Sequence, residues 1–462
     1  MTHDTPVISV LATIQEAIRQ IEMGIGSAGF IVDTREECLG QISIQQLRRM
    51  ILSGADAAAR LTPDLALNPL RISKGRITDR KLLAEIAHDM EMGNLEVCPV
   101  VDARNQVVGG LGLKEIRKKI SAIAAGPAPA RVAPHGNVLV VGGGGYLGSI
   151  LVRKLLQAGR RVRVLDSFIY GRRSLAALEG HKGLEVVEGD FRNIQTVVDS
   201  LRDIDAVVLL AAVVGDPAAQ SRPEQTIETN VMAAQALAFA CKLHCISRFV
   251  FASTCSVYGR TKDVLDENAP LNPVSLYARS KIFSERNLLD LAGDNFSPTI
   301  LRMGTLYGFS PRMRFDLVVN TMSMKAHMEK RIQVYGGNQW RPLLHVEDAA
   351  SAFKACLDAP LARIGNQIFN VGSNTQNYRI LEIADLIGRT LKRVDIQVEH
   401  AQFDARDYRV SFDKIQRGLG FRPNQTIPQA ARRIVRELVS GQIKNPYARV
   451  YYNHYFDATE ES

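Results

Sequence analysis

A glycine-rich segment, Gly142 to Gly148, constrains the fold of this chain more than any other feature. It directly follows an apolar, β-branched run at 137–141, which is typical of a buried parallel strand, and precedes an amphipathic helical pattern at 149–159. A second strand-like run at 162–166 ends in Asp166. Glycines at such a place let the backbone turn tightly and approach a pyrophosphate, whose charge is stabilised at the helix N-terminus. The order strand, turn, helix, strand and acid therefore predicts a dinucleotide site.

The residue at the end of the second strand, Asp166, indicates which dinucleotide binds. The glycines have the spacing G-x-x-G-x-x-G (Gly142, Gly145, Gly148), although their neighbours also satisfy other registers. Asp166 can accept hydrogen bonds from an adenosine ribose and would repel a 2′-phosphate, so we expect NAD rather than NADP. The alternative, a glycine-rich turn without a ligand, is disfavoured by the strands and helix around it.

Further apolar runs at 184–187, 207–212 and 249–252 alternate with helical patterns. Strands and helices that alternate in this way predict an α/β fold with a doubly wound parallel sheet. We expect a Rossmann-type domain of this kind, followed by a smaller C-terminal substrate domain.

An Ala-, Pro- and Gly-rich segment at 122–136 has no hydrophobic periodicity and is typical of a linker. At roughly 150 residues per domain, the 462 residues suggest about three folding units. We expect a tandem domain at 1–121, a cofactor- and substrate-binding domain at 137–445 and an aromatic tail at 446–462. The tyrosines of that tail favour docking on the body of the protein or on a partner subunit.

The part before the linker contains an internal repeat with a constant offset of 69 residues. The repeated features are Phe30–Asp33 and Pro99–Asp102, Gly40 and Gly109, Leu47 and Ile116, and the apolar sets Ile14, Ala17, Ile21 and Leu83, Ile86, Met90. A constant offset indicates two copies of one unit made of helix, strand, strand and helix. Because neither copy could bury much surface alone, we expect the two to pack on each other.

Over roughly residues 7–120 this repeat resembles a pair of CBS modules, a tandem regulatory domain that often binds adenine nucleotides. The family's ribose-binding signature is a Ser or Thr after the second strand and an Asp three positions later. Those places hold Ser43 and Gln46 in the first copy, and Gly112 and Glu115 in the second. Since both acids are changed or lengthened and one hydroxyl is missing, a structural or oligomerising role and adenine-nucleotide sensing both stay open.

A second group of residues predicts chemistry. Tyr277 and Lys281 stand four residues apart in a helical pattern, so the phenol and the ammonium share one face of the helix. A nearby cation, helped by an oxidised nicotinamide, favours the phenolate and lowers the tyrosine pKa from its reference of about 10. Such a phenol can act as a general base toward a sugar hydroxyl near neutral pH.

From residue 137 to about 445 the chain resembles an extended short-chain dehydrogenase/reductase of the nucleotide-sugar epimerase/dehydratase family. The resemblance rests on the glycine motif and Asp166, on Gly189-Asp190, Leu210–Ala212, Thr229–Val231, Ser253–Gly259 and Tyr277–Lys281, and on Leu301-Arg302, Tyr307-Gly308, Gln339–Pro342, His345–Asp348 and Asn370–Gly372. It implies Thr254 as the catalytic hydroxyl, Tyr277 as the base and Lys281 as its partner. The cofactor contacts that it implies, together with the glycine segment, are Gly142, Gly145, Tyr146, Leu147, Gly148, Asp166, Asp190, Phe191, Ala211, Ala212, Asn230, Tyr277 and Lys281. The implied substrate contacts are Arg341 and Arg406, two guanidinium groups that suit a nucleotide diphosphate, and Asn320.

Departures from the family pattern narrow the reaction. Members that dehydrate the sugar carry Asp-Glu directly after the catalytic Thr, where this chain has Cys255 and Ser256. Members that epimerise at C3 and C5 use a Cys just before the Val of the VYG-like motif, and Ser256 fills that place. Thr305 replaces an Asn of the family's substrate pocket. C4 oxidation and re-reduction remains, which is a 4-epimerase; the alternatives are a net dehydrogenase or reductase, a dehydratase with an acid from elsewhere, and a catalytically idle NAD-binding regulator.

Composition bears on partners and location. The net charge of +9 is scattered along the chain, which suits a small anionic ligand at least as well as nucleic acid, so we expect a nucleotide-diphosphate sugar and no nucleic acid. Cys241, His244 and Cys245 lie in an apolar helical pattern and are better explained as helix residues than as metal ligands, so no metal is expected. No apolar run reaches the roughly 18 residues of a membrane span, which favours a cytoplasmic protein without a membrane partner. The family resemblance implies a homo-oligomer, a dimer or larger.

Overall fold

The computed structural model describes residues 5–23, 28–62, 70–77, 79–92, 97–125, 136–399 and 406–453. The chain forms two compact units, Met1–Ala130 and Arg131–Ser462. Most of the expected linker, 126–135, and the end of the aromatic tail, 454–462, lie outside the described residues. The expected domain boundaries therefore stay predictions. Within the described ranges, every helix is too short or too polar to cross a bilayer.

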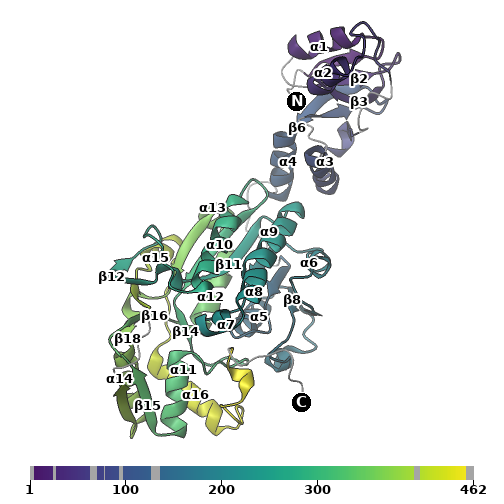
Figure 1. Ribbon diagram of the computed structural model, residues 1–462. Helices are drawn as coiled ribbons and strands as arrows, with labels where there is room; N and C mark the ends of the chain where they lie inside the picture. The colour runs from purple at the N-terminus through teal and green to yellow at the C-terminus, as the bar shows by residue number, and fades with distance from the viewer. Residues whose placement is uncertain are drawn as a thin grey trace. The chain divides into compact units, whose positions relative to one another are not determined.

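The first unit contains two small sheets with the same plan (Figure 1). In each, the first and second strands are parallel and the second and third are antiparallel. The elements are β1 (Val7–Ser9), α1 (Ile14–Met23), β2 (Ala28–Val32), β3 (Cys38–Ser43) and α2 (Ile44–Leu52), then β4 (Ile72–Ser73), α3 (Arg80–Met92), β5 (Val97–Val101), β6 (Val107–Gly112) and α4 (Leu113–Ala125).

The two halves of this unit repeat each other in detail. Ile31 lies opposite Gly40 in one sheet, and Val100 lies opposite Gly109 in the other. Both halves have an irregularity at the next residue. The apolar helix positions that the repeat predicts are buried in both copies. The arrangement agrees with two copies of one unit, whereas the identity of that unit as a pair of CBS modules stays a prediction.

The second unit is built on a seven-stranded sheet in which all strands are parallel. The strand order is β17-β13-β11-β10-β7-β8-β9. The bounds are β7 (Val138–Val141), β8 (Val162–Asp166), β9 (Leu184–Glu188), β10 (Ala206–Leu209), β11 (Arg248–Thr254), β13 (Ser297–Met303) and β17 (Gln367–Val371). The predicted doubly wound α/β sheet is confirmed. Two boundaries differ from the expectation: β10 ends at Leu209, before Leu210–Ala212, and β11 extends to Thr254.

Helices cover both faces of this sheet (Figure 1). One face packs against α5 (Gly148–Gln157) and α12 (Val346–Asp358), and the other against α6 (Ile194–Ser200), α9 (Ala234–Leu243) and α10 (Leu276–Asp290). The apolar strand residues point alternately into these two layers, which explains why the strands are apolar throughout their length. The layout leaves the carboxyl ends of the strands as the place for a ligand.

A smaller part with its own core follows the main sheet in the second unit. Its helices and strands are α11 (Val318–Met328), α14 (Ile380–Leu391), α15 (Asp413–Leu419), α16 (Ile427–Val439), β14 (Thr305–Tyr307), β15 (Arg331–Tyr335), β16 (Trp340–His345), β18 (Asn377–Arg379), β19 (Asp395–Glu399) and, paired with β12 (Arg260–Leu265), β20 (Asp407–Val410). Short helices α7 (Asp216–Ser221), α8 (Pro223–Ile227) and α13 (Leu361–Ile364) complete the unit.

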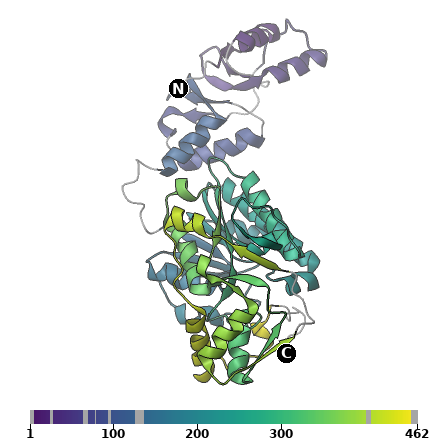
Figure 2. The same cartoon turned by 90° about the vertical axis from the view of Figure 1, so that its left-hand side faces the viewer.

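The described end of the chain folds back onto this part (Figure 1, Figure 2). The amide of Phe315 donates to the carbonyl of Tyr451 at 2.9 Å, and their rings meet edge to face with centroids 5.6 Å apart. Tyr447 donates from its hydroxyl to Glu329 at 2.9 Å. Residues 446–453 therefore dock on the body of the same chain.

Candidate functional site

A pocket lies at the carboxyl ends of β7, β8 and β10, and we call it the dinucleotide pocket. Most of the predicted cofactor residues line it: Gly142, Gly145, Tyr146, Leu147, Gly148, Asp166, Asp190, Phe191, Ala211, Ala212, Tyr277 and Lys281. The fold thus brings together residues that are far apart in the sequence, from the glycine segment to α10.

The glycine segment has the shape that a dinucleotide requires. Gly142 has a φ of +87°, and a Cβ there would lie 2.6 Å from the amide nitrogen of Ala211. Asp166 is held in place because its two carboxylate oxygens accept from the amides of Gly144 and Phe168, each at 2.8 Å. A side chain would block the loop, and the fixed carboxylate faces the pocket, so these residues fit NAD.

Asn230 has a different place from the other predicted cofactor residues. It is buried in a π-helical turn between α8 and α9, and it is not among the residues that line the pocket. Its side chain accepts from the amide of Val213 at 2.8 Å and donates to the carbonyl of Val213 and to Ser280, each at 3.0 Å. These contacts position the loop after β10 against α10, and a direct cofactor contact stays a prediction.

Tyr277 and Lys281 lie on one face of α10 and both line the dinucleotide pocket. Burial raises the pKa of the Tyr277 phenol, the Asp216 carboxylate raises it further, and Arg314 and a hydrogen bond with Thr254 lower it. Burial also lowers the pKa of Lys281 to about 7. Its ammonium donates to the carbonyl of Ala252 at 2.9 Å. The expected fall in the tyrosine pKa is therefore not produced by the protein's own groups, because removal from water outweighs them.

Thr254 stands at the end of β11 beside the phenol. Its hydroxyl donates to the Oγ of Ser256 at 3.1 Å, and it accepts from the amide of Ser256 at 3.1 Å. The Ser256 hydroxyl in turn lies 3.4 Å from that of Tyr408, a buried residue of β20. The Thr254 hydroxyl also lies close enough to the Tyr277 phenol to lower its pKa.

A buried ion pair that the sequence did not single out supports α10 one turn beyond Lys281. The guanidinium of Arg302 on β13 lies 2.7 Å from the carboxylate of Glu285, and both side chains are less than 5% exposed. Ser253 also donates to Glu285. These contacts fix the helix that carries the base to the two strands beneath it.

A second pocket adjoins the first, and the two share Val214, Ala218, Arg314 and Asn453 as lining residues. The predicted substrate residues Arg341 and Arg406 both line it. Arg341 is buried and donates to the carbonyls of Trp340, at 2.8 Å, and Arg406. Arg406 forms an ion pair with Asp216 at 3.1 Å.

Asn320, the third predicted substrate residue, lies away from the lining of this pocket. It is fully buried on α11, where its amide accepts from Gly308 at 2.8 Å and donates to the carbonyl of Arg314 at 2.9 Å. It holds the loop before α11 in place, and the predicted substrate contact is not explained by this geometry.

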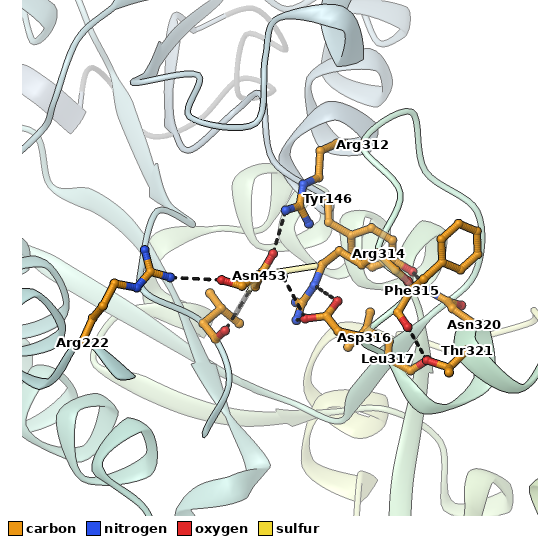
Figure 3. Close-up of polar contacts among 11 residues, drawn as sticks. Tyr146, Arg222, Arg312, Arg314, Phe315, Asp316, Leu317, Asn320, Thr321 and Asn453 are labelled. Atoms are coloured by element: carbon orange, nitrogen blue, oxygen red, sulfur yellow. Dashed lines mark hydrogen bonds and ion pairs between the residues drawn. The ribbon is translucent and has the colours of Figure 1, made fainter. Parts of the chain in front are cut away.

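Sequence reasoning missed three residues of these pockets (Figure 3): Arg312, which lines the first pocket, and Arg314 and Asn453, which line both. Arg314 forms a two-bond ion pair with Asp316, at 3.0 and 2.7 Å. Two arginines two residues apart, at 312 and 314, were a usable signal. No feature of the sequence indicated Asn453, because its place in the pockets depends on how residues 446–453 fold back onto the body of the protein.

The model of the NAD dependent epimerase/dehydratase family matches residues 138–372. This chain belongs to that family. NAD, the cofactor predicted from the sequence, is the cofactor of this family. The activity of this chain is therefore that of an NAD-dependent epimerase/dehydratase family acting on nucleotide sugars.

Relatives within the family differ in the reaction they are named for. The low-salt glycan biosynthesis protein Agl12 of Haloferax volcanii is 30% identical over 62% of this chain and 93% of its own length. A dTDP-glucose 4,6-dehydratase of Streptomyces niveus is 29% identical over 62% and 88%. The structure of a UDP-glucose 4-epimerase from Thermus thermophilus, in complex with NAD, is 25% identical, with a TM-score of 0.57 over 66% of this chain and 99% of that one.

Proposed function

We propose that this protein is an NAD-dependent nucleotide-sugar 4-epimerase. It would oxidise C4 of a nucleotide-linked sugar, let the keto sugar turn over and reduce it on the other face. The observation that carries the proposal is the union of Tyr277, Lys281 and the glycine segment in one pocket, with Thr254 beside the phenol and no carboxylate at positions 255 and 256.

Each residue has a chemical role in this reaction. When bound, NAD supplies a reversible acceptor for the hydride of C4. Tyr277 takes the proton of the C4 hydroxyl and later returns it. Thr254 donates a hydrogen bond to the phenolate, and the positive charge of Lys281 stabilises it. Arg341 and Arg406 bind the diphosphate, for which two guanidinium groups are well suited.

The first test is the reaction itself. Purified protein is incubated with UDP-, dTDP- and GDP-sugars while absorbance at 340 nm and the sugar products are followed. We expect a C4 epimer and no accumulated NADH, whereas steady accumulation of NADH would indicate a net dehydrogenase.

The second test is Tyr277→Phe. Loss of a general base costs roughly 10²–10⁴-fold in turnover. NAD affinity should stay near that of the wild type, because the ring still fills its place in the pocket. Unimpaired turnover in this variant would refute the assignment.

A dehydratase is the second candidate, and a specific observation favours it. Asp216 lines the second pocket, and its charge acts on Tyr277, so it could supply the acid that positions 255 and 256 lack. Ser275 donates to its carboxylate at 2.7 Å, which fixes its position. A 4-keto-6-deoxy product that disappears in Asp216→Asn would support this reaction over epimerisation.

A further inference from the structure

The dinucleotide pocket has a wall that comes from the C-terminal half of the second unit. The loop 308–314 is tied to the start of α5 by three contacts. Tyr146 donates from its hydroxyl to the carbonyl of Gly308 at 2.5 Å, and Ser310 donates to the carbonyl of Tyr146 at 2.6 Å. The Ser310 hydroxyl also lies 3.1 Å from that of Ser149. Arg312 follows two residues after Ser310 in this loop and lines the same pocket as the glycine segment, where a pyrophosphate is bound in sites of this kind.

The guanidinium of Arg312 is held but not neutralised. Arg312 is only 6% exposed and lines the dinucleotide pocket. Its guanidinium lies over the ring of Tyr170, 3.7 Å from the centroid, and donates to the side-chain oxygen of Asn453 at 2.7 Å. Among the described residues, its Nε has no hydrogen-bond partner and the side chain forms no ion pair with a carboxylate.

The other buried cations of the pocket are compensated. Arg314 is paired with Asp316, and Arg192, which is more exposed, also lies 2.6 Å from Asp190. Lys281 donates to a carbonyl and is close to Glu285. Burial and the charge of Arg314 lower the pKa of Arg312 to about 10, although the Asp316 carboxylate, which is already paired with Arg314, raises it. A buried charge of this kind is costly unless a ligand supplies the partner.

We propose that Arg312 binds the pyrophosphate of NAD from the side opposite the glycine segment, and that Asn453 positions its guanidinium for this contact. The pyrophosphate carries two negative charges, and a guanidinium can donate two parallel hydrogen bonds to it. The inference rests on the NAD site and does not depend on which sugar is turned over.

Asn453 connects this contact to the rest of the pocket (Figure 3). Its carbonyl accepts from Arg222 at 3.0 Å, its amide donates to Asp316 at 3.4 Å, and its side chain donates to the carbonyl of Val214 at 3.5 Å. These partners come from both sides of the pocket, so Asn453 links the two sides.

Calorimetric titration of the full chain, freed of bound nucleotide, with NAD, ADP, UDP and adenosine tests the proposal. Arg312→Gln should weaken NAD and ADP by roughly 10- to 100-fold, the usual size of a lost charge-assisted bond, and leave adenosine within about twofold. Arg312→Lys keeps the charge, so its affinities for NAD and ADP should lie between those of the wild type and those of Arg312→Gln. Asn453→Ala should weaken NAD less than Arg312→Gln does, and should add little to it in the double variant.

Arg160→Gln is the matched control, since Arg160 is equally buried but pairs with Asp358 outside the pocket. It should lower thermal stability and leave NAD affinity as in the wild type. Wild-type affinity of Arg312→Gln for NAD and ADP would overturn the proposal. A loss of affinity for UDP alone in Arg312→Gln would also overturn it, because the guanidinium would then bind the substrate and not NAD. Because these readouts need no turnover, a failure of the proposed epimerase reaction would be distinguishable from a failure here.

Discussion

At the scale of single residues, the acidity of Tyr277 depends on where one proton points. The Thr254 hydroxyl has a single hydrogen and two candidate acceptors, the Tyr277 oxygen and the Oγ of Ser256. A hydrogen bond donated to a phenolate favours the charged form and lowers the tyrosine pKa. Ser256, which stands where dehydratases of the family carry a carboxylic acid, thus competes with the base for its stabilising donor.

This competition predicts opposite effects for two neighbouring substitutions. In Ser256→Ala, the Thr254 proton is free for the phenolate, so the acidic limb of kcat/KM should move to lower pH. In Thr254→Ala, the donor is lost and the limb should move to higher pH, with turnover reduced by roughly 10-fold or more. The measurement is kcat/KM between pH 5.5 and 9.5 for both variants. Shifts in the same direction would contradict the argument.

Pocket residues that belong to local motifs were predictable from the sequence, and pocket residues that are placed by distant contacts were not. The glycine segment, Asp166 and the Tyr277–Lys281 pair have fixed spacings along one strand, turn or helix, and all line one pocket. Asn320 was expected to touch substrate, and that contact stays a prediction; its amide binds the loop before α11 and the hydroxyl of Tyr146. Such a role is set by tertiary contacts that no spacing reveals.

At the scale of elements, helix α12 begins in an unusual way. The amide of Glu347, the second residue of the helix, donates to Nδ1 of His345 at 3.1 Å, so a neutral imidazole caps the helix. The ring is 6% exposed and meets Tyr307 edge to face. Burial lowers the pKa of His345 to about 4, while Glu347 raises it and Lys154 lowers it. Protonation would place a charge in the core and abolish the cap.

The sign of the resulting pH dependence follows from this shift. Between about pH 6.5 and 4 the unfolded chain binds a proton at His345 that the folded chain does not, so stability falls as the pH falls through this window, by up to about 3 kcal/mol. His345→Asn keeps a capping oxygen and removes the titration. The variant should be less stable at pH 7, and its difference from the wild type should shrink by about that amount toward pH 4.

Urea unfolding followed by the fluorescence of Trp340 is the measurement, because this is the sole tryptophan and it reports on the second unit. His181→Asn is the control: His181 also accepts a backbone amide at Nδ1, at 3.1 Å, but its ring is exposed. A stability difference between His345→Asn and the wild type that stays constant with pH would contradict the prediction.

At the scale of the whole molecule, the first unit has an approximate two-fold symmetry. Glu37 forms an isolated bridge with Gln106, its own counterpart 69 residues on. The positions of the CBS ribose signature serve another purpose here. Ser43 and Gln46 form a capping box at the start of α2, and the amide of Gly112 donates to Glu115 at 3.2 Å. These side chains satisfy helix ends that would otherwise be unpaired.

We therefore expect the first unit to bind no adenine nucleotide. A fragment of residues 1–130, titrated with AMP, ADP and ATP in a calorimeter, should give no heat beyond dilution. Heat that saturates with any one of the three would contradict this and restore the sensor hypothesis.

The second unit also leaves apolar side chains exposed on two adjacent helices. Phe239 and Leu243 on α9 are 52% and 42% exposed, Phe283 on α10 is 51% exposed, and Met232 just before α9 is 62% exposed. The Asn287 amide donates to Gln235 at 3.4 Å, so the two helices lie side by side. Exposed aromatic residues gathered on one face favour association, and the family resemblance implies that a second copy packs its own pair of helices here.

A homodimer through this face predicts a concentration-dependent mass that a single charge can change. Phe283→Asp would bury a carboxylate without a partner in the interface, which costs several kcal/mol and should turn dimers into monomers at micromolar concentration. Val439→Asp is the control, since Val439 on α16 is even more exposed, at 70%, and lies on another helix. Light scattering after size exclusion gives the mass of each variant. A dimer that survives Phe283→Asp would place the interface elsewhere.

The same variant links the dimer to catalysis, because the base Tyr277 stands on the same helix as Phe283. A monomer with unchanged turnover would mean that the buried contacts of Glu285 and Arg302 alone hold α10 in its active position.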